Sequence, residues 1–215
     1  NISWQFGDGE FLAKTVNIPV ISNFRQGDVA LGGQGAPLVP IFDEFLLRNN
    51  NDFVFAVNIG GISNTTVLPP NNSKKNILAF DCGPGNILID LTMKKFFDKE
   101  YDVDGETGEL GKVDDELFAE FEKFEYFKRS IPKSTGLDVF NLEFLNHFIK
   151  NKYIAPVNLV ATLTELTAWC IAESIIYINV PNFKVFISGG GSANRGLVRR
   201  IKKYLPDNSI EILTK

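Results

Sequence analysis

Residues 53–68 decide the fold, and they read FVFAVNIGGISNTTVL. The run Phe53–Ile59 is apolar and rich in β-branched and aromatic residues, which is typical of a buried strand. Gly60-Gly61 predicts a tight turn, and Ile62–Leu68 returns as a partner strand. We therefore expect two paired strands joined by a glycine turn.

Outward from this pair, short apolar runs alternate with helical patterns. Further strands are predicted at Ile18–Ser22, Ile77–Phe80, Val185–Ile187 and Ile210–Leu213. Apolar residues at helical spacing predict helices at Pro37–Leu47, Asn86–Phe97, Asp114–Phe124, Leu137–Lys150, Pro156–Asn179 and Ala193–Tyr204. Asp102–Gly111 and the glycine-rich segment Gly27–Gly35 are expected to be loops. The pattern indicates an α/β chain in which residues 1–52 lead into one domain formed by residues 53–215.

The composition is that of an ordinary soluble globular protein. Of the 215 residues, 44 % are hydrophobic and 22 % are charged, with a formal net charge of −4. There is no basic field for nucleic-acid binding and no apolar run of the roughly 20 residues that cross a bilayer. Cys82 and Cys170 form no CxxC pattern, so we expect free, buried thiols and a cytoplasmic location. The N-terminus, without Met or a leader pattern, is expected to be a cut into a longer protein.

Three glycine-rich turns are each expected to follow a strand. They are Gly60-Gly61, Gly83-Pro84-Gly85 and Gly189-Gly190-Gly191. Glycine lets a backbone N–H approach a ligand closely, and strand-to-helix turns direct N–H groups toward anions. Any one of these turns could simply be a tight connection, but three in one domain favour a phosphate or nucleotide cleft. None of them matches a GxGxxG or GxxxxGK[ST] motif.

Several polar residues are further candidates for a site. Asp28, in a glycine-rich segment before a helix, could act as a general base or a metal ligand, or be an exposed loop acid. Lys133 could meet a phosphate or be a solvated loop lysine. His147 is the only histidine and is expected to be structural or at the surface, which excludes a histidine-based metal cluster.

Five segments together resemble the anhydro-N-acetylmuramic acid kinase family. The longest, residues 23–40, reads NFRQGDVALGGQGAPLVP. The others are NIGGISNTT at 58–66, FDCGPGN at 80–86, PKSTG at 132–136 and SGGGSAN at 188–194. Their order and rough spacing also agree with the family, over nearly the whole chain. One departure is Cys82, where relatives usually carry Thr, so that a hydroxyl is lost.

This resemblance implies an actin-like ATPase (ribonuclease H-like) lobe with a mixed sheet flanked by helices, as a fragment of a two-lobed kinase. It implies that residues 1–52 carry the catalytic base, Asp28, and that residues 53–215 carry the second phosphate turn and the adenosine turn. The ATP-binding residues that it implies are Asn58, Gly60, Gly61, Asn64, Gly189, Gly190, Gly191 and Asn194. Further cleft candidates are Arg25, Gln34, Asp81, Gly83, Gly85 and Lys133. Asp28 is also the candidate metal ligand.

The implied reaction uses ATP and Mg²⁺ to open a small-molecule 1,6-anhydrosugar with water and to phosphorylate O6, in cell-wall sugar recycling. A levoglucosan kinase, or a truncated nucleotide-binding module without turnover, are the alternatives. The family's first phosphate turn and its C-terminal acid-bearing helix do not occur in the sequence, so we expect the isolated chain to be inactive. We expect no nucleic-acid or membrane partner, and we name a homodimer as the candidate assembly.

Overall fold

The computed structural model describes residues 7–32, 38–150, 152–205 and 210–212. The chain divides into two compact units, residues 1–46 and residues 47–215, and each is described by itself. The first unit contains the helices α1 (Gly9–Val16) and α2 (Phe24–Ala30) and nearly all of α3 (Val39–Leu47). Pro37, the expected start of the third helix, lies outside the described residues.

Two expectations for the first unit are wrong. Ile18–Ser22 is not a strand, because the described part of this unit offers no other strand with which it could pair. Asp28 lies in α2 and not in a loop, since the glycine-rich segment begins with a helical turn after Asn23. The helix α1 has a clear start, because the Asp8 carboxylate accepts the N–H groups of Glu10 and Phe11 at 2.9 and 3.0 Å.

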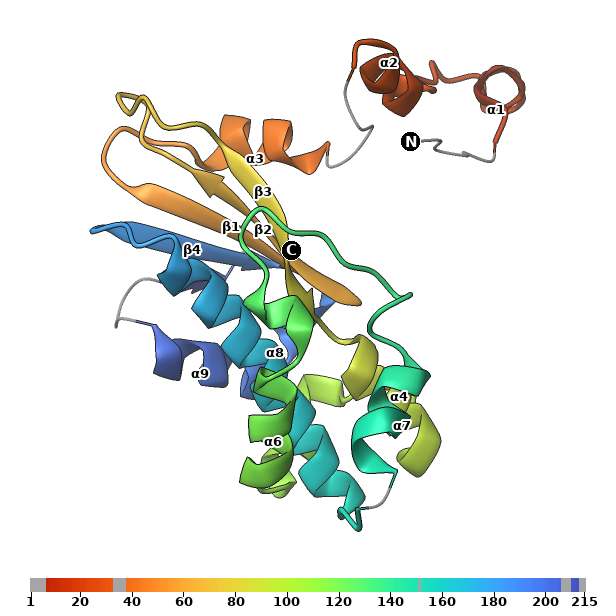
Figure 1. The fold of residues 1–215 in the computed structure, drawn as a ribbon. Helices are drawn as coiled ribbons and strands as arrows, with labels where there is room; N and C mark the ends of the chain where they lie inside the picture. Colours follow the sequence, from red (N-terminus) through yellow and green to blue (C-terminus); the bar gives the residue numbers. More distant parts are fainter. Residues whose placement is uncertain (1–6, 33–37, 151, 206–209, 213–215) are drawn as a thin grey trace. The chain divides into compact units, whose positions relative to one another are not determined.

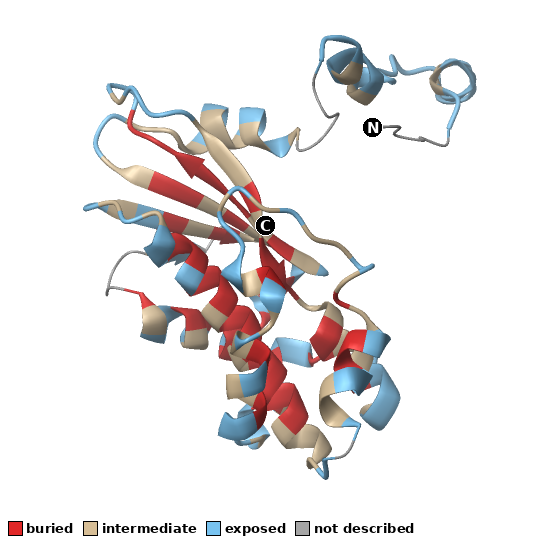
Figure 2. Ribbon diagram, viewed as in Figure 1, coloured by how far each residue is buried: buried red, intermediate tan, exposed pale blue. Residues whose placement is uncertain are grey.

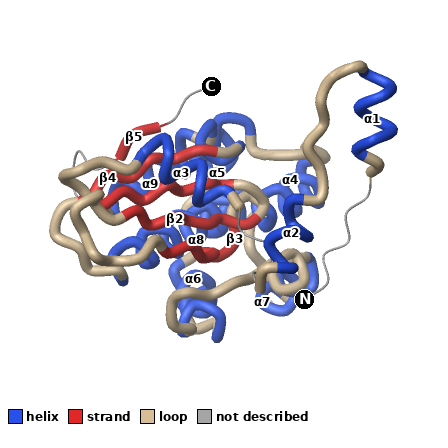
Figure 3. The backbone as a smooth tube through the Cα atoms, turned by 90° about the horizontal axis from the view of Figure 1, so that it is seen from above, coloured by secondary structure: helices blue, strands red, loops and turns tan. Residues whose placement is uncertain are grey.

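The second unit is built on a five-stranded sheet with the strand order β3-β2-β1-β4-β5. The strands are β1 (Phe53–Ile59), β2 (Ile62–Leu68), β3 (Leu78–Pro84), β4 (Phe183–Ser188) and β5 (Ile210–Ile212). The strand β2 is antiparallel to both neighbours, whereas β1, β4 and β5 pair in parallel. Figure 1 shows β1 to β4 side by side, and Figure 3 shows β3 and β5 at opposite edges of the sheet. This mixed sheet flanked by helices confirms the expected fold class.

The connections between the strands carry the helices. After β3 follow α4 (Ile87–Phe97), the 3₁₀ turn η1 (Val103–Gly105), α5 (Glu106–Leu110), α6 (Asp115–Glu122), the 3₁₀ turn η2 (Glu125–Lys128), α7 (Leu142–Ile149) and α8 (Pro156–Tyr177). After β4 follow the 3₁₀ turn η3 (Gly190–Ala193) and α9 (Arg195–Tyr204). The sequence thus places most helices correctly, with their ends shifted by a few residues.

The long helix α8 belongs to two hydrophobic clusters at once. Its C-terminal half, including Ile171 and Ile175, packs with the sheet and α9. Its N-terminal half, including Leu159 and Leu163, packs with α4, α6 and α7. Fourteen of its 22 residues are buried, and Figure 2 shows the buried colour along most of its length. The expectation that no apolar run reaches the length that crosses a bilayer is corrected, because among the described residues α8 alone is long and apolar enough to span one. Its burial is that of a core helix.

Two further expectations are corrected in the helical part. Residues 103–110 form short helical turns and not a loop, because the Asp102 carboxylate accepts the N–H groups of Thr107 and Gly108 at 2.8 and 2.9 Å. The helix expected from Leu137 begins at Leu142, where the Asn141 side chain caps it by accepting the Phe144 N–H at 3.0 Å.

Asp90, in the first turn of α4, lies where its charged form is disfavoured. Burial raises its pKa to about 6, and the nearby carboxylates of Asp102 and Glu100 add to the effect. Between its ordinary pKa of 3.8 and this value, the folded protein binds more protons at Asp90 than the unfolded chain does. The free energy of unfolding therefore falls as the pH rises from about 4 to about 6.

We predict that Asp90→Asn, which mimics the protonated acid, is more stable than the wild type above pH 6 and equal to it near pH 4. Thermal unfolding of both proteins across this pH range measures the difference. The exposed Asp104→Asn is the matched control and should follow the wild type. The prediction would be contradicted if the difference in unfolding temperature between Asp90→Asn and the wild type were the same at every pH.

Candidate functional site

The three glycine turns meet at one end of the sheet. The strands β1, β3 and β4 run in the same direction, because β2 reverses the chain between β1 and β3 and β4 is parallel to β1. Their carboxyl ends therefore lie at one edge, where Gly60-Gly61 follows β1 and Gly189-Gly190-Gly191 follows β4. In open α/β sheets this edge is the usual place for a ligand. The expectation for the second turn is corrected. Gly83 and Pro84 pair with Ser63 and Ile62 as the last residues of β3, so the strand runs beyond Phe80 and only Gly85 follows it.

Hydrogen bonds join the first turn to the second. The Gly60 carbonyl accepts the Asn86 N–H at 2.8 Å. The Gly61 carbonyl accepts the N–H groups of Gly85 and Ile87 at 2.9 and 3.1 Å. The N–H groups of Gly85, Asn86 and Ile87 are thus used within the protein and are not available to an anion.

The glycines fall into two groups according to the space around them. A Cβ on Gly85 would lie 2.2 Å from the Gly60 carbonyl oxygen, and one on Gly191 would lie 2.3 Å from the Ile59 side chain. A Cβ on Gly83 or Gly189 would also meet other atoms within 3.0 Å. By contrast, a Cβ on Gly60, Gly61 or Gly190 would come no closer than 3.5 Å to any described atom outside its chain neighbours. The first group is required by packing, whereas the second group, the open glycines, leaves room for a Cβ at ordinary van der Waals distance.

The open glycines also carry unused donors. Among the described residues no acceptor takes the N–H of Gly61 or of Gly190. The Asn58 side chain lies between the two turns, since its Oδ1 is 2.6 Å from a Cβ position on Gly189 and its Nδ2 is 3.8 Å from one on Gly60. Two backbone N–H groups and an amide side chain of this kind suit an anionic ligand.

A row of polar side chains crosses the sheet one residue inward from this edge. Asn58 is paired with Ser188 on one side and with Asn64 on the other, and Asn64 is paired with Asp81. Directly paired residues share a face, and neighbouring strands lie about 4.8 Å apart. All four residues are half-buried, whereas their neighbours Val57 and Cys82 point into the core on the other face. The row therefore offers one hydroxyl, two amides and one carboxylate along four strands.

Asp81 is held by the segment that follows η2. Its Oδ2 accepts the Thr135 N–H at 2.9 Å, and its own N–H donates to the Lys133 carbonyl at 2.9 Å. Burial raises the pKa of Asp81, although the hydrogen bond from Thr135 acts in the opposite direction. The Lys133 ammonium lies 4.7 Å from the centre of the Tyr126 ring, and burial lowers its pKa. Contact of either residue with a substrate stays a prediction.

The third turn leads directly into α9, and η1 packs against the start of that helix. Asn194 is buried and caps α9, because its Oδ1 accepts the Leu197 N–H at 2.9 Å and its N–H donates to the Gly191 carbonyl at 3.1 Å. A Cβ on Gly105 would lie 2.2 Å from the Asn194 Oδ1, so η1 packs tightly against this cap. The geometry explains Asn194 as a cap, and its expected contact with a nucleotide stays a prediction.

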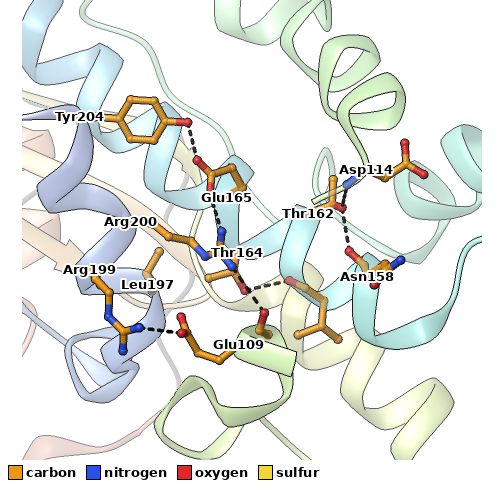
Figure 4. A network of polar contacts seen from close by, with 12 residues as sticks. Glu109, Asp114, Asn158, Thr162, Thr164, Glu165, Leu197, Arg199, Arg200 and Tyr204 are labelled. Carbon is orange, nitrogen blue, oxygen red and sulfur yellow. Dashed lines mark hydrogen bonds and ion pairs between the residues drawn. The ribbon is translucent and has the colours of Figure 1, made fainter. Parts of the chain in front are cut away.

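A network of polar contacts holds α9 against α8 and α5 (Figure 4). The Glu165 carboxylate accepts hydrogen bonds from Arg200 at 2.6 Å and from the Tyr204 hydroxyl at 2.5 Å. Arg200 also reaches the Gly108 carbonyl at 3.4 Å, and Arg199 pairs with Glu109 at 2.6 Å. The Arg200 and Glu165 side chains are only 13 % and 16 % exposed, so the loss of one partner would leave a poorly solvated charge.

The remaining expected residues belong to the first unit. Arg25 and Asp28 lie three residues apart in α2 and so share one face of that helix. Gln34 lies outside the described residues. The role of Asp28 as a base or metal ligand stays a prediction. Within the described ranges no cluster of three or more His, Cys, Asp or Glu residues could hold a metal ion.

The structure adds two residues that the candidate list lacked. Ser188 completes the polar row through its pairing with Asn58. Asn86 links all three turns, because its N–H donates to Gly60, its amide donates to the Ile59 carbonyl at 3.5 Å, and its side chain lies 3.0 Å from a Cβ position on Gly191. Asn86 closes the FDCGPGN segment, so its place after a glycine turn was the available signal.

Comparisons with known proteins agree with the resemblance noted in the sequence. A family model described as anhydro-N-acetylmuramic acid kinase matches residues 1–215. An anhydro-N-acetylmuramic acid kinase of Pseudomonas syringae pv. syringae is 39 % identical over 214 residues, covering 99 % of this chain and 58 % of that protein. The one of Caldanaerobacter subterraneus subsp. tengcongensis is 40 % identical over 219 residues, covering 98 % of this chain and 55 % of that protein. The chain thus spans a little more than half the length of these relatives.

A solved structure also matches part of the chain. The activator of the 2-hydroxyisocaproyl-CoA dehydratase from Clostridium difficile, with bound ADPNP, has a TM-score of 0.47 and 18 % identity. The match covers 81 % of this chain and 57 % of that one. A likeness at this level carries no conclusion about function.

The space around the glycines predicts a contrast between two substitutions. Gly190→Ala should change the free energy of unfolding by no more than about 0.5 kcal/mol, because its Cβ would meet only the Asn86 amide, at an ordinary 3.9 Å. Gly85→Ala should cost about 1–3 kcal/mol, because its Cβ would collide with the Gly60 carbonyl and separate the first two turns. Urea unfolding of both variants measures the difference, and equal losses would contradict the proposed division of the glycines.

Proposed function

The chain belongs to the anhydro-N-acetylmuramic acid kinase family, and from this we propose that it supplies a nucleotide-binding lobe and the catalytic base of an ATP-dependent kinase. The substrate that we propose is 1,6-anhydro-N-acetylmuramic acid, in cell-wall sugar recycling. The product is the corresponding sugar 6-phosphate.

The meeting of the three glycine turns is the observation that carries the nucleotide part of this proposal. Gly61 and Gly190 present unused N–H groups at the same edge of the sheet, with the Asn58 amide between them. Phosphoryl transfer depends mainly on positioning and on stabilising charge, and such donors contribute to both. We assign the turn at Gly60-Gly61 to phosphate and the turn at Gly190 to adenosine.

Magnesium fits the same edge through the chemistry of its side chains. Asp81 offers a carboxylate, and Asn58 and Asn64 offer amide oxygens, in the polar row beside the turns. Mg²⁺ prefers oxygen ligands and usually keeps several waters. When bound with ATP, it would neutralise charge on the phosphates.

We assign the opening of the anhydro ring to Asp28. Its carboxylate takes a proton from water, whose oxygen forms a bond to C1 while the bond between C1 and O6 breaks. O6 keeps the electron pair of that bond and attacks the γ-phosphorus of ATP, and ADP leaves. The proton on Asp28 then returns to solvent. Carboxylates commonly act as general bases of this kind, and the assignment to Asp28 comes from the family motif at residues 23–40.

We predict that Asp28→Asn lowers kcat by about 10² to 10⁴, because an amide keeps the shape of the side chain but cannot accept the proton. ATP affinity should be largely retained. The measurement is the single-turnover rate in a chain that spans the relatives' full length, together with the position of ¹⁸O after reaction in labelled water. Label at C1 is expected, and Glu10→Gln in the same unit is the control for charge.

Three results would contradict the proposal or narrow it. A near wild-type rate for Asp28→Asn, or product without label at C1, would exclude Asp28 as the base or water as the nucleophile. Preferred turnover of levoglucosan, which lacks the N-acetyl and lactyl groups, would make the protein a kinase of that sugar. Nucleotide binding without turnover of either sugar would leave a binding module.

We predict that Gly190→Val raises the KM for ATP more than the KM for the sugar. A Cβ at this position meets the Asn86 amide at an ordinary 3.9 Å, and the added methyl groups would crowd a ligand at the third turn. Steady-state kinetics with each substrate varied in turn measure the two constants, and the sugar KM is the internal control. An unchanged KM for ATP would remove the third turn from the nucleotide site.

A further inference from the structure

A separate pocket of about 200 Å³ lies beside the edge strand β3. It is lined by Cys82 of β3, by Trp169 and Cys170 of α8, and by Phe127, Ile131 and Lys133 of the segment after α6. Cys82 points to the face of the sheet that α8 covers, whereas the polar row lies on the other face. The pocket therefore lies on the opposite face of the sheet from the polar row. It adjoins the second glycine turn, because a Cβ on Gly83 would lie 2.9 Å from Phe127 and 3.0 Å from the Cys170 sulfur.

The inner part of this pocket is apolar and aromatic. The rings of Phe127 and Trp169 meet edge to face with centroids 5.2 Å apart. Cys82 and Cys170 are free and buried, and burial raises the pKa of Cys82 to about 12 and that of Cys170 in the same direction. Both thiols therefore stay neutral near pH 7. Such walls suit the flat, apolar body of a ligand.

The charged groups around this inner part are mostly positive. Lys128, Arg129 and Lys133 line the pocket, and Glu173 is the acid among its lining residues. Among the described residues no carboxylate lies within ion-pair distance of Lys133, whose ammonium has only the Tyr126 carbonyl at 3.4 Å and two aromatic rings. A poorly solvated ammonium without an anionic partner favours an anion beside it.

The size of the pocket limits the ligand. A volume of about 200 Å³ is smaller than the roughly 300–1,000 Å³ of sites for drug-sized molecules. A molecule with one ring and one charged group matches this space. The aromatic walls and the single half-buried ammonium match the same description.

We propose that this pocket binds a small organic anion of one ring, whose carboxylate faces Lys133 and whose ring lies against Phe127 and Trp169. The site needs neither the nucleotide nor the anhydrosugar. Its occupant lies next to the segment that holds Asp81, because the Lys133 carbonyl accepts the Asp81 N–H.

Trp169 supplies the signal for the test. In a Trp4→Phe background it is the only tryptophan in the chain, so its fluorescence reports on the pocket. The probes are benzoate, its neutral analogue benzamide, and inorganic phosphate. We expect saturable binding of benzoate, at least tenfold weaker binding of benzamide, and no saturable signal with phosphate.

Variants of Lys133 separate charge from packing. Lys133→Met keeps an unbranched side chain against the aromatic rings and removes the charge, so the preference for benzoate over benzamide should disappear. Lys202→Met, an exposed lysine on α9, is the matched control and should keep the preference. If Lys133→Met does not fold, as judged by its thermal unfolding, Lys133→Gln takes its place.

Three outcomes would overturn the proposal. They are the absence of saturable benzoate binding, equal binding of benzoate and benzamide by the wild type, and an unchanged preference in the folded Lys133 variant. None of them depends on ATP binding or turnover, so this test and those of the proposed function fail separately.

Discussion

The fold of the second unit depends on the burial of α8 between two hydrophobic clusters. One half of the helix packs on the sheet, and the other half packs on the aromatic cluster of α6 and α7. Full burial of a side chain such as Ile171 or Leu163 contributes about 1.5–3 kcal/mol, so each half is strongly held. Trp169 and Phe127 contact both clusters. Through these two residues and α8, the cluster on the sheet is joined to the cluster of the helical part.

The elements with strong local signals could be predicted from the sequence, and those that depend on distant partners could not. β1 and β2 agree with their predicted bounds to the residue, because their apolar pattern and the Gly60-Gly61 turn act locally. Ile18–Ser22 has the composition of a strand but no partner in the described part of its unit. The helical turns after Asp102 depend on two hydrogen bonds to one carboxylate, which composition does not indicate.

The candidate site was predictable to a similar degree. The places of Gly60-Gly61 and Gly189-Gly190-Gly191 after strands follow from sequence, whereas Gly83 and Pro84 belong to the end of β3, and the structure brings all three segments to one edge. The polar row does not follow from sequence, because the pairing of Asn64 with Asp81 depends on an irregularity between Ser63 and Asn64 that shifts the register. Gly85 and Gly190 look alike in the sequence, yet Gly85 is required by packing whereas Gly190 has room for a Cβ. Only the surroundings of each Cβ separate these roles.

The polar contacts that hold α9 in place would affect the affinity of a ligand at the third glycine turn. Glu165 holds Arg200 and Tyr204 together, while Asn194 fixes the start of the same helix. Ordering one residue of backbone costs about 1–2 kcal/mol of conformational entropy, and for the third turn this cost is met during folding. A ligand that arrives there finds a preorganised surface and loses little affinity to the ordering of the chain. Differences between ligands at this turn should then appear mainly in how slowly each one dissociates.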